Sequence, residues 1–159
     1  DSDCIAAPSL LARHLMHGDL VVCGAFRELP VTALGLLKRA GNFDDLWDQS
    51  TEDFRSRDGE ASKSRLVSWR ECYSGNLSLP RELFLSIGGF DEAGYRCHDL
   101  DIGYRLAEVG ARFLFDGECR AIHLEHPRAL TYRVQQHQGI SRLADKYPAL
   151  KGFMAEHAM

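Results

Sequence analysis

The chain has 159 residues, 45% of them hydrophobic, which is enough to bury a core of its own as one globular domain. A formal net charge of −4 excludes the strongly basic surface by which proteins bind nucleic acid. No apolar run approaches the roughly 20 residues of a membrane-spanning helix. Five scattered cysteines without a CxxC pair indicate reduced thiols in a reducing compartment.

The first part of the chain alternates between predicted helix and strand. Apolar residues recur at helical spacing over residues 8–17, which predicts a helix. Pro8 stands near its start, where the missing backbone N–H of proline costs little. The β-rich run 20–26 predicts a buried strand, and residues 34–40 predict one or two helical turns. Residues 42–64 are acidic and rich in serine, which is typical of a solvated loop or lid with one short helix.

The middle of the chain is expected to be extended over residues 66–79, around a tight turn at 74–76. A short helix is predicted over 80–87, with Pro80 at its first position and a glycine pair after its end. An amphipathic helix is predicted over 99–109, and a glycine ends it. Its expected buried face consists of Ile102, Leu106 and Val109.

Two short strands and a helical region complete the chain. Residues 112–115 and 119–124 predict the strands. Residues 129–159 are mostly helical and end in a polar tail. Because strands and helices interleave along the whole sequence, the predicted fold class is α/β, in a single domain over residues 1–159.

Asp1 and Asp3 frame the sequence DSD at the start of the chain. Two carboxylates one residue apart can address one hard cation from neighbouring directions. Such an ion can bridge a diphosphate and neutralise the charge of a departing nucleotide. The same pattern is common in turns and at helix caps, so a structural role is the alternative.

A second group of polar residues lies in the sequence SGNLSLPRELFLSIGGFDEAGYRCHDLD, residues 74–101. Gly88 and Gly89 permit a sharp turn with positive φ, which brings backbone N–H groups close to a ligand. Asp91 and Glu92 place two carboxylates on the loop that follows.

Asp99 and Asp101 are expected in the first turn of a helix. Acidic residues are common there because they complement the helix dipole, so capping is one interpretation. The same dipole keeps a carboxylate ionised, which suits a base that must already be deprotonated. Chemistry alone leaves both interpretations open for Asp99.

His123 and His126 flank Glu125 in the sequence HLEH, at the end of a predicted strand. A histidine near a strand end usually packs against neighbours or caps the strand. Two histidines downstream of a carboxylate pair also suit a manganese-type site that they would share with the DSD carboxylates.

Together these sequences resemble the catalytic half of GT-A glycosyltransferases, especially bacterial family 2 enzymes and the C-terminal galactosyltransferase-like domain. The most specific stretches are YSGNLSLPRELFLSIGGFDE and HDLDIGYRLAEVGARF, with DSD upstream and HLEHPR downstream. The resemblance implies the C-terminal half of a Rossmann-like nucleotide-diphospho-sugar transferase fold, with a mixed sheet and flanking helices. The N-terminal half that binds the nucleotide would then be missing, and we expect these 159 residues alone to be inactive.

The resemblance implies a metal site. Asp3, with help from Asp1, would hold Mn²⁺ or Mg²⁺ against the donor diphosphate. His123 matches the third protein ligand of that ion, and it is favoured over His126 because it lies nearer the strand.

The resemblance also implies a substrate site in which Asp99 acts as general base on the acceptor hydroxyl. Asp101 would hold the sugar or brace the loop, and Arg105 would make a structural salt bridge beneath the site. The remaining substrate-binding residues would be Gly75, Asn76, Gly88, Gly89, Asp91, Glu92, Tyr95 and His98.

Two positions depart from the family's pattern. His98 stands where the family has a glutamate immediately before the base, which leaves the identity of the acceptor open. Tyr95 replaces the usual tryptophan before that pair, although a tyrosine ring can still stack on a sugar.

The predicted function is inverting, metal-dependent transfer of a sugar, of the hexosyl type, from a UDP-linked donor to a glycan or glycolipid hydroxyl. Such an enzyme would serve bacterial polysaccharide biosynthesis in the cytoplasm, with peripheral association at the inner face of the membrane left open. The alternatives are a non-catalytic carbohydrate-binding remnant of the fold and a metal-dependent nucleotide-sugar phosphohydrolase.

Overall fold

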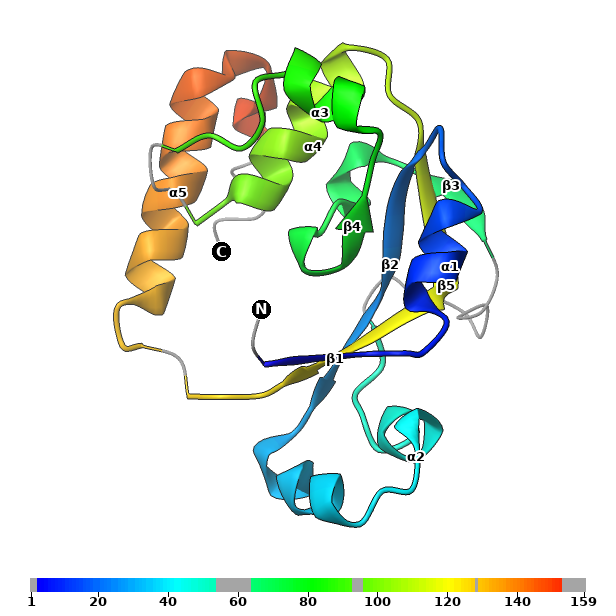
Figure 1. Cartoon of the computed structure of the whole chain (residues 1–159). Helices are drawn as coiled ribbons and strands as arrows, with labels where there is room; N and C mark the ends of the chain where they lie inside the picture. The colour runs from blue at the N-terminus through cyan, green and yellow to red at the C-terminus, as the bar shows by residue number, and fades with distance from the viewer. Residues whose placement is uncertain (1–2, 54–63, 93–95, 128, 153–159) are drawn as a thin grey trace.

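The structure, a computed structural model, describes residues 3–53, 64–92, 96–127 and 129–152. Figure 1 shows a mixed five-stranded sheet with flanking helices, as the α/β prediction expected. The strands are β1 (Cys4–Ala6), β2 (Val21–Leu29), β3 (Arg65–Val67), β4 (Leu77–Ser78) and β5 (Phe113–Leu124). The α-helices are α1 (Leu10–Leu15), α2 (Phe43–Trp47), α3 (Arg81–Ser86), α4 (His98–Glu108) and α5 (Tyr132–Lys146). The 3-10 segments are η1 (Val31–Lys38), η2 (Trp69–Glu71), η3 (Ser74–Asn76) and η4 (Pro148–Leu150).

Strand β5 is the centre of the sheet. The strand order is β1–β5–β2–β4, and β3 also pairs with β5. β5 runs parallel to β2 and antiparallel to β1 and β3. Its register with β2 shifts where Gly24 pairs with Asp116 and Ala25 pairs with Arg120, so residues 117–119 bulge out of the ladder. The prediction of two separate strands at 112–115 and 119–124 was therefore wrong, because the bulge imitates a turn in the sequence.

Other predicted elements have different bounds in the structure. Residues 66–79 are not continuously extended, because η2 and η3 interrupt them between β3 and β4. Strand β1 was missed, since three residues are too few to show an alternating pattern. Val109 lies at the C-cap of α4 and is 56% exposed, so it does not belong to the buried face. The positive φ of 79° at Gly110 confirms the predicted helix end.

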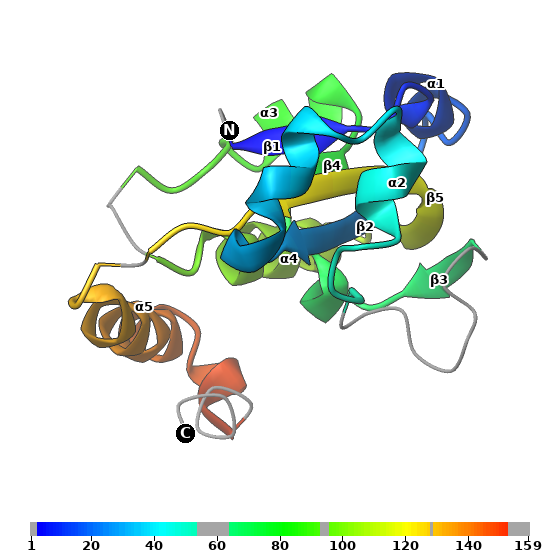
Figure 2. The ribbon, with the colours of Figure 1, turned by 90° about the horizontal axis from the view of Figure 1, so that it is seen from below.

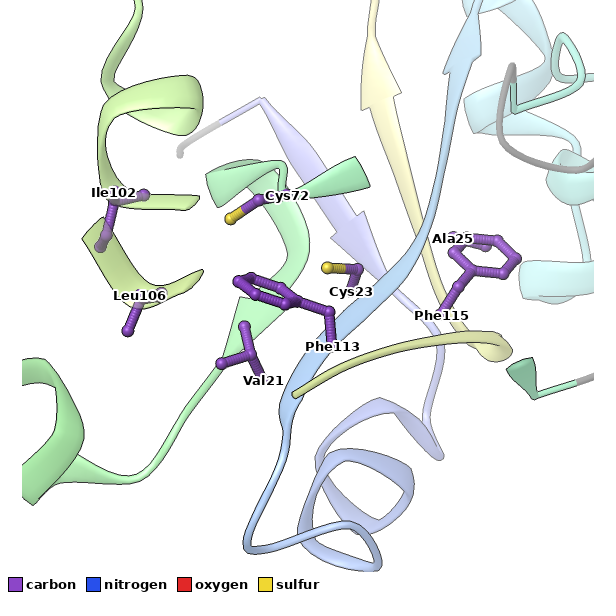
Figure 3. Close-up of a cluster of buried hydrophobic side chains, with 8 residues drawn as sticks. All are labelled: Val21, Cys23, Ala25, Cys72, Ile102, Leu106, Phe113 and Phe115. Carbon is purple, nitrogen blue, oxygen red and sulfur yellow. The ribbon is translucent and has the colours of Figure 1, made fainter. Parts of the chain in front are cut away.

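The main core lies between the sheet and α4. In Figure 3, Val21 and Phe113 point from the sheet toward Ile102 and Leu106 of α4. Both α4 side chains are fully buried, at 0% exposure, as the helical spacing predicted. Helix α4 also approaches η2 closely, because a Cβ on Gly103 would lie only 2.6 Å from the Trp69 carbonyl oxygen. Burial of this face therefore fixes where the start of α4 lies relative to the sheet.

A smaller apolar cluster joins α5 to α4. Cys97, Ile140, Leu143 and Leu150 are buried in it, and Leu100 and Tyr104 of α4 pack against them. Figure 2 shows α5 on the opposite side of the β2–β5 pair from α1 and α2. The predicted helical character of the region after residue 129 is confirmed up to η4, and residues 153–159 lie outside the described part.

Asp101 is the polar link that connects α4 to α5. Its carboxylate is 2% exposed and accepts from Arg105 at 2.6 Å, from Lys146 at 2.7 Å and from Tyr147 at 2.9 Å. Arg105 in turn donates to the carbonyl oxygens of Ile87 and Gly89, both at 2.7 Å. The structural salt bridge predicted for Arg105 is thus confirmed, and it extends to the turn after α3.

The pKa of Asp101 reflects this network. Burial alone would raise it, but the hydrogen bonds from Lys146, Tyr147 and Arg105 outweigh burial and hold it below the ordinary value of 3.8. A lowered folded-state pKa means that the carboxylate stabilises the fold above the ordinary value, and that this contribution is lost as pH falls through the folded-state pKa.

All five cysteines, each within the described part of the chain, are free thiols. Burial is the main cause that raises the pKa of Cys119 to about 12, so this side chain remains a protonated thiol at neutral pH. Among the described helices, none is both long and apolar enough to cross a membrane.

We predict that Asp101→Asn lowers the free energy of unfolding at neutral pH by about 2–4 kcal/mol, because Arg105 and Lys146 lose their buried carboxylate. Urea unfolding at several pH values measures this difference. The difference should shrink as pH falls below 3.8, where the wild-type carboxylate becomes protonated. Asp145→Asn, at an exposed position of α5, is the matched control. Equal stability of Asp101→Asn and wild type at neutral pH would contradict the role assigned to this network.

Candidate functional site

Asp3, His123 and His126 form a cluster at the edge of the sheet where β1 meets β5. One ligand atom from each of the three side chains lies within 4.8 Å of the others. Asp3 Oδ2 is 3.4 Å from His123 Nε2 and 3.3 Å from His126 Nε2. The pairing of Cys4 with His123 and the hydrogen bond from Leu124 N to Asp3 O, at 2.8 Å, bring these distant residues together. The structure thus places both histidines, and not His123 alone, beside Asp3.

The electrostatics of the cluster favour an ionised carboxylate. Desolvation would raise the pKa of Asp3, but a backbone hydrogen bond and the charges of His123 and His126 lower it overall. A carboxylate and two imidazoles are a donor set that suits a divalent transition metal such as manganese. The residues therefore fit the ion that the sequence predicted. Asp1, the other predicted metal ligand, lies outside the described residues.

Glu28 of β2 lies on the other side of the His123 ring. Its Oε1 is 3.6 Å from His123 Nδ1, and that buried nitrogen has no hydrogen-bond partner among the described residues. A carboxylate behind a histidine fixes the ring orientation when the opposite nitrogen binds a metal. The other ring nitrogen of His123, Nε2, then faces the Asp3 carboxylate.

A cavity of about 660 Å³ opens between η3, the start of α4 and one face of α5. Its lining residues are Tyr73, Ser74, Arg96, His98, Asp99, Tyr132, Gln135, Gln138, Gly139 and Arg142. Asp99 is half-buried, and its Oδ1 accepts the backbone N–H of Ser74 at 2.9 Å. Its second oxygen has no hydrogen bond to any described residue. A carboxylate with one oxygen free of hydrogen bonds in a polar cavity can accept a proton from a ligand hydroxyl.

Phe26 connects the cavity to the Asp3–His123–His126 cluster. Its ring centroid lies 5.1 Å from that of Tyr73 in the cavity wall and 5.8 Å from that of His123. Gly75 makes this packing possible, because a Cβ there would lie 2.7 Å from Tyr73 Cε1 and 3.1 Å from Phe26 Cζ. The candidate base and the candidate metal ligands are therefore neighbours across two aromatic rings.

Asn76, predicted to line the substrate site, is instead buried at 5% exposure. Its Nδ2 donates to the carbonyl oxygens of Ala25 at 2.9 Å and Cys119 at 2.7 Å. His14 Nε2 donates to its Oδ1 at 2.8 Å. The side chain thus bridges β2 to the bulge of β5. Because both of its polar atoms make internal hydrogen bonds, Asn76 is not part of the proposed site.

Several other predicted residues do not line the cavity either. Gly88 and Gly89, with φ of 79° and 71°, form the turn after α3. Asp91 is paired with Lys146 at 2.6 Å, and Asp101 is buried in the network described above. Glu92 is exposed in the turn that follows Asp91. Tyr95 lies outside the described residues.

The sequence did not predict the contribution of α5. Tyr132, Gln135, Gln138 and Arg142 come from a helix that carried no recognisable motif. Gly139 allows the close approach, since a Cβ there would lie 3.0 Å from Cys97 Sγ. Only the docking of α5 against Cys97 shows that these side chains share a cavity with Asp99.

No model of a known protein family matches the chain. The uncharacterized glycosyltransferase YfnE of Bacillus subtilis (strain 168) is 27% identical over 189 aligned residues, 92% of this chain and 48% of that protein. Validoxylamine A glucosyltransferase of Streptomyces hygroscopicus subsp. jinggangensis (strain 5008) is 28% identical over 117 residues, 72% of this chain and 28% of that protein. O-antigen biosynthesis protein RfbC of Myxococcus xanthus is 34% identical over 82 residues, 51% of this chain and 5% of that protein.

The chain spans about half the length of YfnE and a smaller share of the other two relatives. The names of the first two support a glycosyltransferase family and, at that level, a transferase.

We predict that Asn76→Asp destabilises the protein by about 3 kcal/mol or more, because a carboxylate would face two carbonyl oxygens in the interior. Thermal and urea unfolding measure the loss. The matched control is Asn42→Asp at the N-cap of α2, where an aspartate accepts the same backbone N–H equally well. Similar unfolding midpoints for the two variants would contradict the internal role of Asn76.

Proposed function

We propose that the chain carries the catalytic half of an inverting, metal-dependent glycosyltransferase of the GT-A type, close to family 2. The reaction is the transfer of a hexosyl group from a nucleotide-diphospho-sugar, with UDP as the expected nucleotide, to a hydroxyl of a glycan or glycolipid. Residues 1–159 would be the C-terminal part of the catalytic domain. The reaction would take place in the cytoplasm, with peripheral association at the inner face of the membrane left open.

The observation that carries this proposal is the adjacency of two chemically different groups. The Asp3–His123–His126 cluster offers ligands for a cation, and the neighbouring cavity holds a partly unbound carboxylate, Asp99. The Phe26 ring packs against His123 of the cluster and against Tyr73 of the cavity wall. Displacement at the anomeric carbon of a nucleotide sugar needs both parts, one at the leaving diphosphate and one at the attacking hydroxyl.

Asp3, His123 and His126 would hold Mn²⁺ or Mg²⁺. When bound, such an ion neutralises the negative charge that develops on a departing nucleoside diphosphate. Glu28, behind His123, would orient the imidazole for this task.

Asp99 would act as the general base. It lies in the first turn of α4, and the N–H of Ser74 holds one of its oxygens in a fixed position. The other oxygen would accept the proton of the acceptor hydroxyl, whose oxygen then attacks the anomeric carbon as the nucleotide leaves. A single displacement of this kind inverts the anomeric configuration.

The relatives' names agree with this chemistry. One is a glucosyltransferase, and another belongs to O-antigen biosynthesis. They support a hexosyl donor and a polysaccharide acceptor for this chain as part of the proposal.

We predict that the protein binds Mn²⁺, that UDP tightens this binding, and that Asp3→Ala and His123→Ala abolish it. His126→Ala should weaken it by about tenfold or more, because His126, at 54% exposure against 18% for His123, is the less firmly held of the two histidines. Electron paramagnetic resonance of free and bound Mn²⁺ measures the affinity. His137→Ala, an exposed histidine of α5 outside the cluster, is the control. Equal Mn²⁺ affinity in all four variants and wild type would refute the metal site.

We predict that Asp99→Asn lowers kcat of the native protein by about 10²- to 10⁴-fold. The amide oxygen can still accept the N–H of Ser74, so the local structure and Mn²⁺ affinity should stay unchanged. The assay follows sugar joined to an acceptor, and sugar phosphate released in its place would identify a phosphohydrolase instead. Asp145→Asn is the control carboxylate on α5. Normal turnover of Asp99→Asn with metal bound would show that another group is the base.

A further inference from the structure

The cavity beside Asp99 holds more positive than negative charge. Two arginine side chains, Arg96 and Arg142, line it together with a single carboxylate, Asp99. One oxygen of that carboxylate already accepts the N–H of Ser74 at 2.9 Å. None of the other lining side chains is acidic. A neutral sugar would leave the guanidinium of Arg96 without an anionic partner among the described residues.

Arg96 is held in position by groups that do not neutralise it. Its Nε donates to Gln135 Oε1 at 2.7 Å, and its guanidinium carbon lies 4.6 Å from the centroid of the Tyr132 ring. Among the described residues no carboxylate pairs with Arg96, and its two terminal nitrogens make no hydrogen bond. Contact with an amide and with a ring restricts the side chain while leaving its paired donors available.

We infer that this cavity binds an acceptor that carries an anionic group, a carboxylate or a phosphate, on the guanidinium of Arg96. The planar guanidinium can donate two parallel hydrogen bonds to either group, which makes the contact both strong and oriented. Arg142 adds a second positive charge to the same cavity wall. The role of the ligand as acceptor rests on the proposed glycosyl transfer, whereas the binding of an anionic sugar does not.

The position of Arg96 relates this charge to the chemistry. It lies two residues before α4, and Asp99 lies in the first turn of that helix. An anionic group anchored on Arg96 therefore enters the cavity at the same end of α4 as the candidate base. Such an anchor would hold an acid sugar, such as a uronic acid or a sugar phosphate, with its hydroxyls toward Asp99.

Paired glycosides test this inference. Binding of methyl β-D-glucuronide is compared with binding of methyl β-D-glucoside, which has the same ring without the carboxylate, and with a phosphorylated form of the same glucoside. Wild type should bind one or both anionic glycosides at least about tenfold more tightly than the neutral one. The two anionic probes distinguish a carboxylate from a phosphate as the recognised group.

Two variants remove the charge in different ways. Arg96→Gln removes the cation, and Gln135→Glu keeps it but places a carboxylate against its Nε. Both should reduce the preference for the anionic glycoside to within about twofold. Arg96→Lys should retain part of it, because the charge stays but the paired donors are lost. Arg133→Gln, on α5 but outside the cavity lining, is the control that should keep the full preference.

Equal affinity of wild type for all three glycosides, or a preference that survives both Arg96→Gln and Gln135→Glu, would overturn the inference. So would an Arg96→Gln variant that loses UDP binding in the presence of Mn²⁺ but keeps its glycoside preference, because Arg96 would then serve the donor. If the preference depends on Arg96 but the native protein transfers no sugar, the anionic site stands and the proposed function fails. Sugar transfer without any preference refutes the anionic site alone.

Discussion

The pairing of β5 with three other strands is the constraint on which the candidate site depends. Its parallel ladder with β2 and its antiparallel pairing with β1 bring Asp3 beside His123. Asp3 directly precedes the first strand of the chain, and His123 lies near the end of the last one. The bulge at residues 117–119 shifts the register between the two halves of the ladder, and Asn76 bridges it from inside. A Cβ on Gly24 would lie 2.6 Å from the Cys119 carbonyl oxygen, so the bridge requires a glycine there.

A second layer of structure carries the cavity. Ile102 and Leu106 pack α4 against the sheet. Asp101 on the same helix accepts hydrogen bonds from Arg105 of α4 and Lys146 of α5. Asp99 and Asp101 are two residues apart, yet one faces the cavity and the other the interior. Helical geometry turns successive positions by about 100°, which separates a structural carboxylate from a chemically available one.

The two parts of the site make different physical demands. The Asp3–His123–His126 cluster lies where β1 pairs with β5, and strand pairing suits ligands that must hold fixed distances to a cation. The cavity is walled partly by α5, which packs on α4 through a small apolar cluster and the Asp101 network. Its polar, positively charged wall suits a hydrated ligand that enters and leaves, and Phe26 keeps the two parts in contact.

The sequence alone determined the α/β class, the buried face of α4 at Ile102 and Leu106, and its glycine stop, because periodicity and capping are local signals. Its motifs also pointed to Asp3, Asp99 and His123 as candidate groups. Only the tertiary structure decided that β5 is one bulged strand, that Asn76 and Asp101 are internal, and that α5 lines the cavity. These outcomes depend on contacts between segments far apart in the chain. Strand register and helix docking follow from the burial of shared surfaces, which no local pattern specifies.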